Sequence, residues 1–266
     1  MPAVAYPSVI SPVANPAINH WADPKCAKAF WSQHELPAFQ ALVADTLDVA
    51  APAAGEQWLD LGCGGGTLTR GLWHRTGGTV GGVVGVDYAA ANAGKYEAFR
   101  KEVGAGDRVA FRQLDFSHGL GAFADGAFDH AVSGLSISYA EHYDAAAGRW
   151  TDAAYDRLLG EVWRVLKPGG RFVFSVNVPD PSWWAVGVKS ILGGVRASRK
   201  PVRFLKNSLR MMKYGAWLKA EARAGRFHYL PAEVTAGKLT AAGFCRVTHR
   251  LSYAGQAFVF RADKGG

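Results

Sequence analysis

The chain has 266 residues, of which 49% are hydrophobic and 20% are charged, and its formal net charge is +8. This length suits one α/β domain with an insertion, or two small domains, and the hydrophobic fraction is sufficient for a full core. The sequence contains no apolar run long enough to span a bilayer, and residues 1–20 lack the basic start of a secretory signal. The composition therefore excludes an integral membrane protein with apolar spans and favours a soluble globular one.

The three cysteines, Cys26, Cys63 and Cys245, are far apart and odd in number. The sequence has no CxxC pair and no His/Cys cluster at the spacing of metal ligands. We therefore expect a cytoplasmic protein in a reducing compartment, with no structural metal.

Apolar strand-like runs alternate with helix-like stretches from about Phe39 onward. The predicted helices start near Phe39 and then cover Thr67–His74, Asn92–Val103, Asp152–Leu166 and Pro231–Ala242. The predicted strands are Gln57–Leu61, Val80–Val86, Val109–Leu114, Ala127–Val132, Arg171–Val178, Phe244–Leu251 and Gln256–Arg261. Strands separated by helices predict parallel βαβ units, whereas the short link at Tyr253–Gly255 predicts a hairpin with one antiparallel strand.

A glycine-rich loop follows the first predicted strand, in the sequence Asp60-Leu61-Gly62-Cys63-Gly64-Gly65-Gly66-Thr67. Glycines permit positive φ angles and let a ligand approach the backbone closely. Ligands bind at the carboxyl ends of strands in an open α/β sheet, which is where this loop would lie. The carboxylate of Asp60, inside the strand end, can meet a cationic ammonium directly or through water.

Two more acidic residues stand at the ends of the next two predicted strands. Asp87 ends the second strand, where a carboxylate can accept hydrogen bonds from both hydroxyls of a ribose. Asp115 ends the third strand and can accept from an adenine amine, with Phe116 beside the ring. The three acids together with the loop predict a nucleoside-binding site.

Taken in order, these motifs resemble the class I S-adenosylmethionine-dependent methyltransferases. Residues 60–66 are similar to the family's glycine motif, Phe128–Val132 resembles its fourth strand, and Leu158–Phe174 resembles the helix–turn–strand of its small-molecule branch. The resemblance covers about residues 35–180 and 231–261. It implies a doubly wound, Rossmann-like α/β fold with a seven-stranded sheet, mostly parallel with one antiparallel strand.

The same resemblance implies S-adenosylmethionine as the cofactor and assigns a set of contacts to it. The expected cofactor-binding residues are Asp60, Gly62, Cys63, Gly64, Gly66, Asp87, Tyr88, Asp115, Phe116, Ser133, Gly134 and Leu135. The main competing interpretation is a nicotinamide dinucleotide site, which needs glycine or alanine where this chain has Thr67. The carboxylate of Asp60 would repel a diphosphate, so the residues favour the sulfonium nucleoside.

Methyl transfer from a sulfonium is an in-line displacement, and the protein mainly aligns the acceptor and holds water away. A general base is needed only where the acceptor must lose a proton. His142, in the segment after the fourth strand, is the candidate base, with Tyr139 or Glu141 behind it. The alternative is that these three are polar residues on a solvated loop.

Two segments outside the predicted methyltransferase domain are candidates for covering the site. Residues 1–34 are predicted as an N-terminal extension in which Trp21, Phe30, Trp31 and His34 form either a lid or a peripheral packing cluster. The methyltransferase domain is assigned to residues 35–180 and 231–266. Residues 181–230 are predicted as a basic helical insertion, because they contain eleven Lys or Arg and one acid, Glu221.

Within the insertion, Leu205, Leu209, Met212 and Ala216 form an apolar stripe at helical spacing beside a basic one. Such a helix can cover a lipophilic acceptor and contact a membrane surface, bind RNA phosphates, or pack on the domain with a solvated basic face. The aromatic and methionine content favours the first. The segment after the fourth strand lacks the Asn/Asp-Pro-Pro-aromatic motif, which argues against methylation of DNA amino groups.

The sequence thus predicts a methyltransferase for a small, hydrophobic or amphiphilic acceptor such as a quinone, isoprenoid or lipid. An RNA methyltransferase and a non-catalytic S-adenosylmethionine-binding protein stay open as alternatives, although nucleic acid is the less favoured partner.

Overall fold

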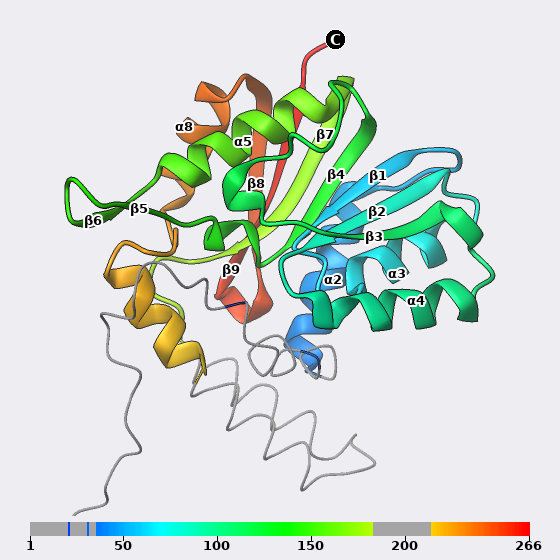
Figure 1. The fold of residues 1–266 in the computed structure, drawn as a ribbon, viewed down its shortest axis with the longest axis horizontal. Coiled ribbons are helices and arrows are strands. Elements are labelled where there is room, and N and C mark those ends of the chain that lie inside the picture. Colours follow the sequence, from blue (N-terminus) through cyan, green and yellow to red (C-terminus); the bar gives the residue numbers. More distant parts are fainter. Residues whose placement is uncertain (1–20, 22–30, 32–35, 183–213) are drawn as a thin grey trace, which may run out of the picture.

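The structure is a computed structural model that describes Trp21, Trp31, residues 36–182 and residues 214–266. A seven-stranded sheet forms the centre of the domain, and helices cover both of its faces (Figure 1). The doubly wound α/β fold predicted from the sequence is confirmed. Among the described residues, no helix combines the length and the apolar character needed to cross a membrane.

Five strands of the sheet run parallel to one another. They lie side by side in the order β3 (Val109–Gln113), β2 (Gly82–Asp87), β1 (Gln57–Leu61), β4 (Phe128–Gly134) and β7 (Leu166–Asn177). The sheet continues with β9 (Ala257–Lys264), which is antiparallel to β7, and ends with β8 (Phe244–Ser252). The link between β8 and β9 is the short turn at Tyr253–Gly255, so the predicted antiparallel strand is confirmed.

The helices divide the core into two apolar layers. The first layer contains α2 (Pro37–Ala50), α3 (Thr67–Arg75) and α4 (Ala93–Glu102), and the second contains α5 (Ala153–Val165) and α8 (Ala232–Ala241), on the opposite face (Figure 1). Helix α5 shows why the sequence pattern was informative. Its predicted apolar face, with Leu158, Leu159, Val162 and Val165, is fully buried against the sheet.

The structure adds two elements to the predicted set. A small antiparallel hairpin, β5 (His142–Asp144) and β6 (Arg149–Thr151), stands where the sequence predicted only an irregular segment. Strand β7 already begins at Leu166, so the run from Lys167 to Gly170 belongs to the strand and not to a separate turn. The last turn of α5 still ends at Val165, as the run's proline and glycines require.

The described part of the basic insertion, residues 214–230, begins with a helical stretch at 214–223 (Figure 1). Its predicted apolar stripe falls mostly on residues 183–213, which lie outside the described residues, as do most of the N-terminal extension and its Phe30 and His34. The two boundaries of the insertion therefore stay predictions.

One close approach in the sheet depends on a residue without a side chain. Gly85 of β2 faces Tyr96 of α4, and a Cβ added at Gly85 would overlap the Tyr96 ring and hydroxyl. Tyr96 is itself fully buried. Glycine at position 85 therefore allows α4 to bring the Tyr96 hydroxyl under the end of β1.

We expect Gly85→Ala to lower the free energy of unfolding by about 1–3 kcal/mol, because it overpacks the α4–sheet contact. Urea unfolding monitored by circular dichroism measures this change. Gly160→Ala is the matched control: nothing lies within 4 Å of an added Cβ in α5, so the change should raise stability by about 0.5–1 kcal/mol. Equal effects of the two substitutions would contradict the packing argument.

Candidate functional site

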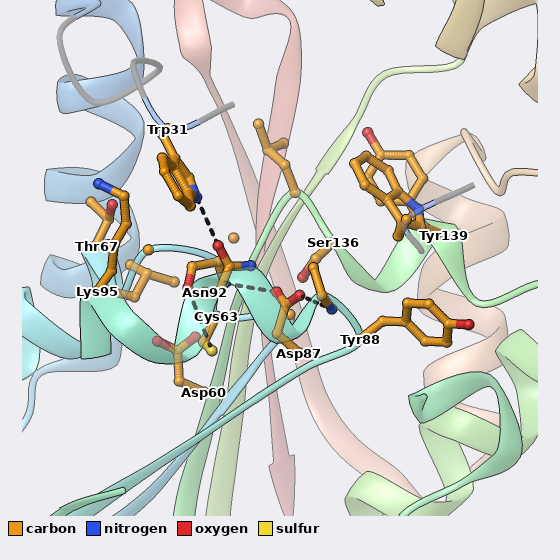
Figure 2. Close-up of a pocket in the computed structure, with 18 of the residues that line it drawn as sticks. Trp31, Asp60, Cys63, Thr67, Asp87, Tyr88, Asn92, Lys95, Ser136 and Tyr139 are labelled. Carbon is orange, nitrogen blue, oxygen red and sulfur yellow. Dashed lines mark hydrogen bonds between the residues drawn. The ribbon is translucent and has the colours of Figure 1, made fainter. Parts of the chain in front are cut away.

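A pocket of about 660 Å³ opens at the carboxyl ends of the parallel strands (Figure 2). We call its two parts the glycine-loop end and the aromatic end. The glycine-loop end is lined by Asp60, Gly62, Cys63, Gly64, Asp87, Asn92 and Lys95. The aromatic end is lined by Trp21, Leu135, Tyr139, Asn177 and Leu218. Ser136 lies between Asp87 and Tyr139 in Figure 2, and the Tyr88 ring lies below Tyr139 in the same view.

Asp60 is buried beneath the glycine loop, at the end of β1. Its Oδ2 atom accepts hydrogen bonds from the backbone N of Thr69 (3.1 Å), the Thr69 hydroxyl (2.7 Å) and the Tyr96 hydroxyl (3.3 Å). Burial raises the pKa of Asp60 to about 6, and the hydrogen bonds from Thr69 oppose this rise. The carboxylate thus connects β1 to the first turn of α3, and it is also part of the pocket wall.

Asp87 holds the glycine loop from the neighbouring strand. Its Oδ2 atom accepts from the backbone N of Gly64, and its Oδ1 atom accepts from the backbone N of Ala89, both at 2.8 Å. Burial raises the pKa of this carboxyl group as well. Gly64 has a positive φ of 51°, and a Cβ there would meet no atom within 4 Å. Asp87 therefore fixes the loop at Gly64, where the space beside the backbone is free for a ligand.

Gly62 brings the loop against the segment that follows β4. It has a positive φ of 63°, and an added Cβ would overlap the side chain of Ser136. The Ser136 hydroxyl donates to the carbonyl of Leu61 at 2.7 Å. This contact joins the two strand ends that form the floor of the pocket.

The other predicted cofactor residues divide into two groups. Tyr88, Phe116, Gly134 and Leu135 line the pocket with the loop residues. Gly66 precedes α3 and, like Ser133, is not part of the described pocket wall. The Ser133 hydroxyl donates to the carbonyl of Leu61 at 2.8 Å. Asp115 caps the turn at Phe116–His118 by accepting from the backbone N of Ser117 at 2.9 Å, and it is not part of the described pocket wall.

Of the three predicted catalytic residues, the structure brings only Tyr139 to the pocket wall. The Nδ1 atom of His142 lies 2.7 Å from the Thr151 hydroxyl, within the hairpin of β5 and β6. Glu141 pairs with Arg226 instead of facing the pocket. The hairpin is the physical reason for this separation, because it directs the chain away from the sheet edge directly after Tyr139.

Arg226 is the centre of a buried ion cluster. Its side chain is 2% exposed, and its Nε atom donates to Oε2 of Glu141 at 2.6 Å. Its Nη1 atom lies 3.3 Å from Oε2 of Glu221, and its guanidinium lies 4.8 Å from the centre of the Trp150 ring. The cluster therefore fastens residues 214–230 to the segment after β4.

Sequence reasoning assigned no role to several wall residues. Asn92 accepts a hydrogen bond from the Trp31 indole at 2.8 Å, and the Lys95 ammonium lies 4.4 Å from the centre of the Trp31 ring (Figure 2). Trp31 and Trp21 were predicted as a lid or a packing cluster, and both line the pocket. Asn92 and Lys95 belong to no recognisable sequence motif. Only the position of α4 next to the glycine loop could have indicated them.

Comparisons with known proteins agree with this geometry. Residues 59–174 match the family described as "Methyltransferase domain". The chain is 32% identical over 191 residues to a demethylmenaquinone methyltransferase of Thermus thermophilus, covering 68% of this chain and 78% of the relative. It is 31% identical over 151 residues to nocamycin O-methyltransferase of Saccharothrix syringae, covering 56% of this chain and 48% of that protein.

A solved structure shares the fold at lower sequence identity. It is the 1,6-didemethyltoxoflavin-N1-methyltransferase of Burkholderia thailandensis with bound 1,6-didemethyltoxoflavin and S-adenosylhomocysteine. The TM-score is 0.56 at 18% identity, with 90% of this chain and 83% of that chain covered.

The chain belongs to the class I S-adenosylmethionine-dependent methyltransferase family. Within the family it is similar to methyltransferases of small molecules. It is therefore an enzyme that uses S-adenosylmethionine as the methyl donor, which removes the alternatives of a dinucleotide site and a non-catalytic binding protein.

We expect Arg226→Met to destabilise the protein by about 3–5 kcal/mol, because it leaves the buried carboxylates of Glu141 and Glu221 without a counter-charge. Urea unfolding measures the change. The matched control is Arg223→Met, three residues earlier, whose exposed pair with Asp180 should contribute less than about 1 kcal/mol. A loss at Arg226 as small as at Arg223 would contradict the cluster's structural role.

Proposed function

We propose that this enzyme transfers the methyl group of S-adenosylmethionine to a small, hydrophobic or amphiphilic acceptor such as a quinone, an isoprenoid or a lipid. The observation that carries the proposal is the shape of the pocket. One cavity joins the acidic glycine-loop end to an end walled by Trp21, Leu135 and Leu218. Donor and acceptor can then meet inside a single enclosure.

The residues of the glycine-loop end fit the donor by their chemistry. Asp87 can accept hydrogen bonds from both ribose hydroxyls, as acids at the end of a second strand do in related folds. The buried carboxylate of Asp60 suits the cationic amino-acid end of the donor, and Phe116 can stack beside the adenine ring. The open backbone at Gly64 allows the donor to approach the loop closely.

The donor supplies a methyl group already activated on a sulfonium, and the protein's contribution is alignment and exclusion of water. Ser136 lies between Asp87 and Tyr139 in Figure 2, where the two ends of the pocket join. Burial raises the pKa of Tyr139 to about 12, so its hydroxyl is neutral near pH 7 and acts by hydrogen bonding. Glu141 and His142, on this view, act through the position of the segment and not on the acceptor.

Two lines of support point to an apolar acceptor. The aromatic end contains ring contacts between Trp21 and Tyr139 (5.0 Å between ring centres) and between Tyr139 and Phe227 (4.9 Å). The relatives include a protein named for methylation of demethylmenaquinone. Contact of residues 181–230 with a membrane surface remains part of the proposal, although residues 183–213 lie outside the described structure.

Transfer of a radioactive methyl label from S-adenosylmethionine tests this function. The enzyme is incubated with a cellular lipid and quinone extract and, separately, with total RNA. We expect turnover into the organic extract and background incorporation into RNA. Label found in RNA alone would contradict the proposal and support the RNA methyltransferase alternative.

We expect Asp87→Ala to weaken S-adenosylmethionine binding at least tenfold, because both ribose hydroxyls lose their acceptor and Gly64 loses its anchor. Isothermal titration calorimetry measures the affinity. Asp107→Ala, an exposed acid in the turn before β3, is the control and should leave the affinity unchanged. Unchanged affinity in Asp87→Ala would count against the site assignment.

Donor affinity should also depend on pH through Asp60. The carboxyl group has a pKa of about 6 in the free protein, and only its ionised form attracts the cationic donor. Affinity should therefore rise as the pH increases from 5 to 7, by up to about tenfold per unit below pH 6. Calorimetric titrations at pH 5 and pH 7 measure this dependence. At pH 7, Asp60→Asn should bind the donor more weakly than the wild-type enzyme does, and its affinity should change much less between the two pH values. The same slope in both proteins would contradict this role.

A further inference from the structure

A neutral polar cluster lies at the aromatic end of the pocket. Its members are Tyr139, in the turn after β4, Tyr229, which follows the insertion, and Asn177, the last residue of β7. The two tyrosine hydroxyls lie 3.1 Å apart. Asn177 lines the same pocket as Tyr139, and hydrogen bonding from its amide opposes the rise in pKa that burial causes in each tyrosine.

The side-chain oxygen of Asn177 is a buried hydrogen-bond acceptor. The residue is 1% exposed, and its side-chain oxygen has no hydrogen-bond partner. It also lines the pocket. A buried carbonyl oxygen without a donor is unfavourable, and such groups in native proteins are usually satisfied by a ligand or an ordered water.

The tyrosine pair has hydrogen-bonding capacity of its own. One hydroxyl proton serves the bond between Tyr139 and Tyr229, which leaves the other proton for a different acceptor. The cluster can therefore accept one hydrogen bond, at Asn177, and donate one, from a tyrosine. A hydroxyl group is a small neutral function that matches both requirements.

The surroundings favour a neutral, ring-containing molecule. Trp21, Phe227 and Leu218 enclose the cluster. Arg226 lies 5.5 Å from the centre of the Phe227 ring, and it is already paired with Glu141 and Glu221. A charged acceptor group would be buried here without a counter-ion, which is strongly unfavourable.

We propose that Asn177 and the Tyr139–Tyr229 pair form a polar anchor that binds a hydroxyl group on an otherwise apolar, ring-containing acceptor. The proposal rests on the proposed function, because it names the chemical class of the acceptor for the same pocket. The anchor selects acceptors by their hydroxyl and fixes the ring in one orientation relative to the donor.

The test compares two probes, 1-naphthol and 1-methoxynaphthalene. The hydroxyl of 1-naphthol can donate a hydrogen bond, whereas the methoxy group that replaces it in the second probe can only accept one. Each is titrated by ligand-observed NMR into enzyme saturated with S-adenosylhomocysteine. Wild-type enzyme should bind 1-naphthol about tenfold more tightly. In Asn177→Leu the enzyme should bind the two probes about equally. In Tyr229→Phe, which keeps the aromatic ring, the ratio of the two affinities should be smaller than in the wild type. Because the methyl group of 1-methoxynaphthalene is equally bulky in all variants, a change in preference reports on the hydrogen bonds.

Leu218→Met is the matched control at the same end of the pocket. It should change the affinity for both probes alike and keep the preference. Wild-type enzyme that shows no preference, as when a water molecule alone satisfies Asn177, would overturn the proposal. A preference that survives in both Asn177→Leu and Tyr229→Phe would overturn it as well.

Calorimetric binding of S-adenosylhomocysteine to the same preparations separates this test from that of the proposed function. Normal binding in Asn177→Leu shows that the fold and the donor site are intact, so a lost preference belongs to the anchor. Conversely, a hydroxyl preference without methyl transfer to any lipid or quinone would count against the proposed function and leave the anchor standing.

Discussion

The site depends on two carboxylates next to the glycine loop, one that holds the loop and one that holds the helices behind it. Asp87 accepts from the backbone N of Gly64, and Asp60 accepts from Thr69 and Tyr96. Burial raises the pKa of both acids because it disfavours their charged forms, which is the condition that our proposed cationic donor would relieve. The same hydrogen bonds fix the start of α3 and the end of β2. Loop geometry and donor chemistry are therefore parts of one arrangement.

The aromatic end of the pocket depends on a different kind of contact. Residues 214–230 reach the sheet edge through the buried Arg226 cluster, which holds Glu141 directly after Tyr139 and Ala140. The backbone N of His228 also donates to the carbonyl of Ser138 at 2.9 Å. The Tyr229 hydroxyl is thereby brought within 3.1 Å of the Tyr139 hydroxyl. The insertion thus completes the pocket wall that the sheet alone leaves open.

The sheet and the donor loop could be predicted from sequence because their signals are local. Apolar runs, glycines and strand-ending acids are neighbours in the chain, and parallel strands bring their ends to one edge. The partners of Asp115 and His142 could not be predicted, because a cap on Ser117 and a hairpin contact with Thr151 are decided by tertiary packing. Asn177 ends β7 and Tyr139 follows β4, so the two residues are far apart in the sequence, yet β4 and β7 are adjacent in the sheet. Sequence order concealed that adjacency.

On our proposal, one cavity holds the sulfonium nucleoside at its acidic end and the acceptor at its aromatic end. A crystal structure with bound S-adenosylhomocysteine would test this arrangement. We expect the ribose hydroxyls on Asp87, the amino-acid end near Asp60 and the sulfur directed toward Leu135 and Tyr139. A nucleoside bound outside the glycine loop, or a sulfur directed away from Tyr139, would contradict it.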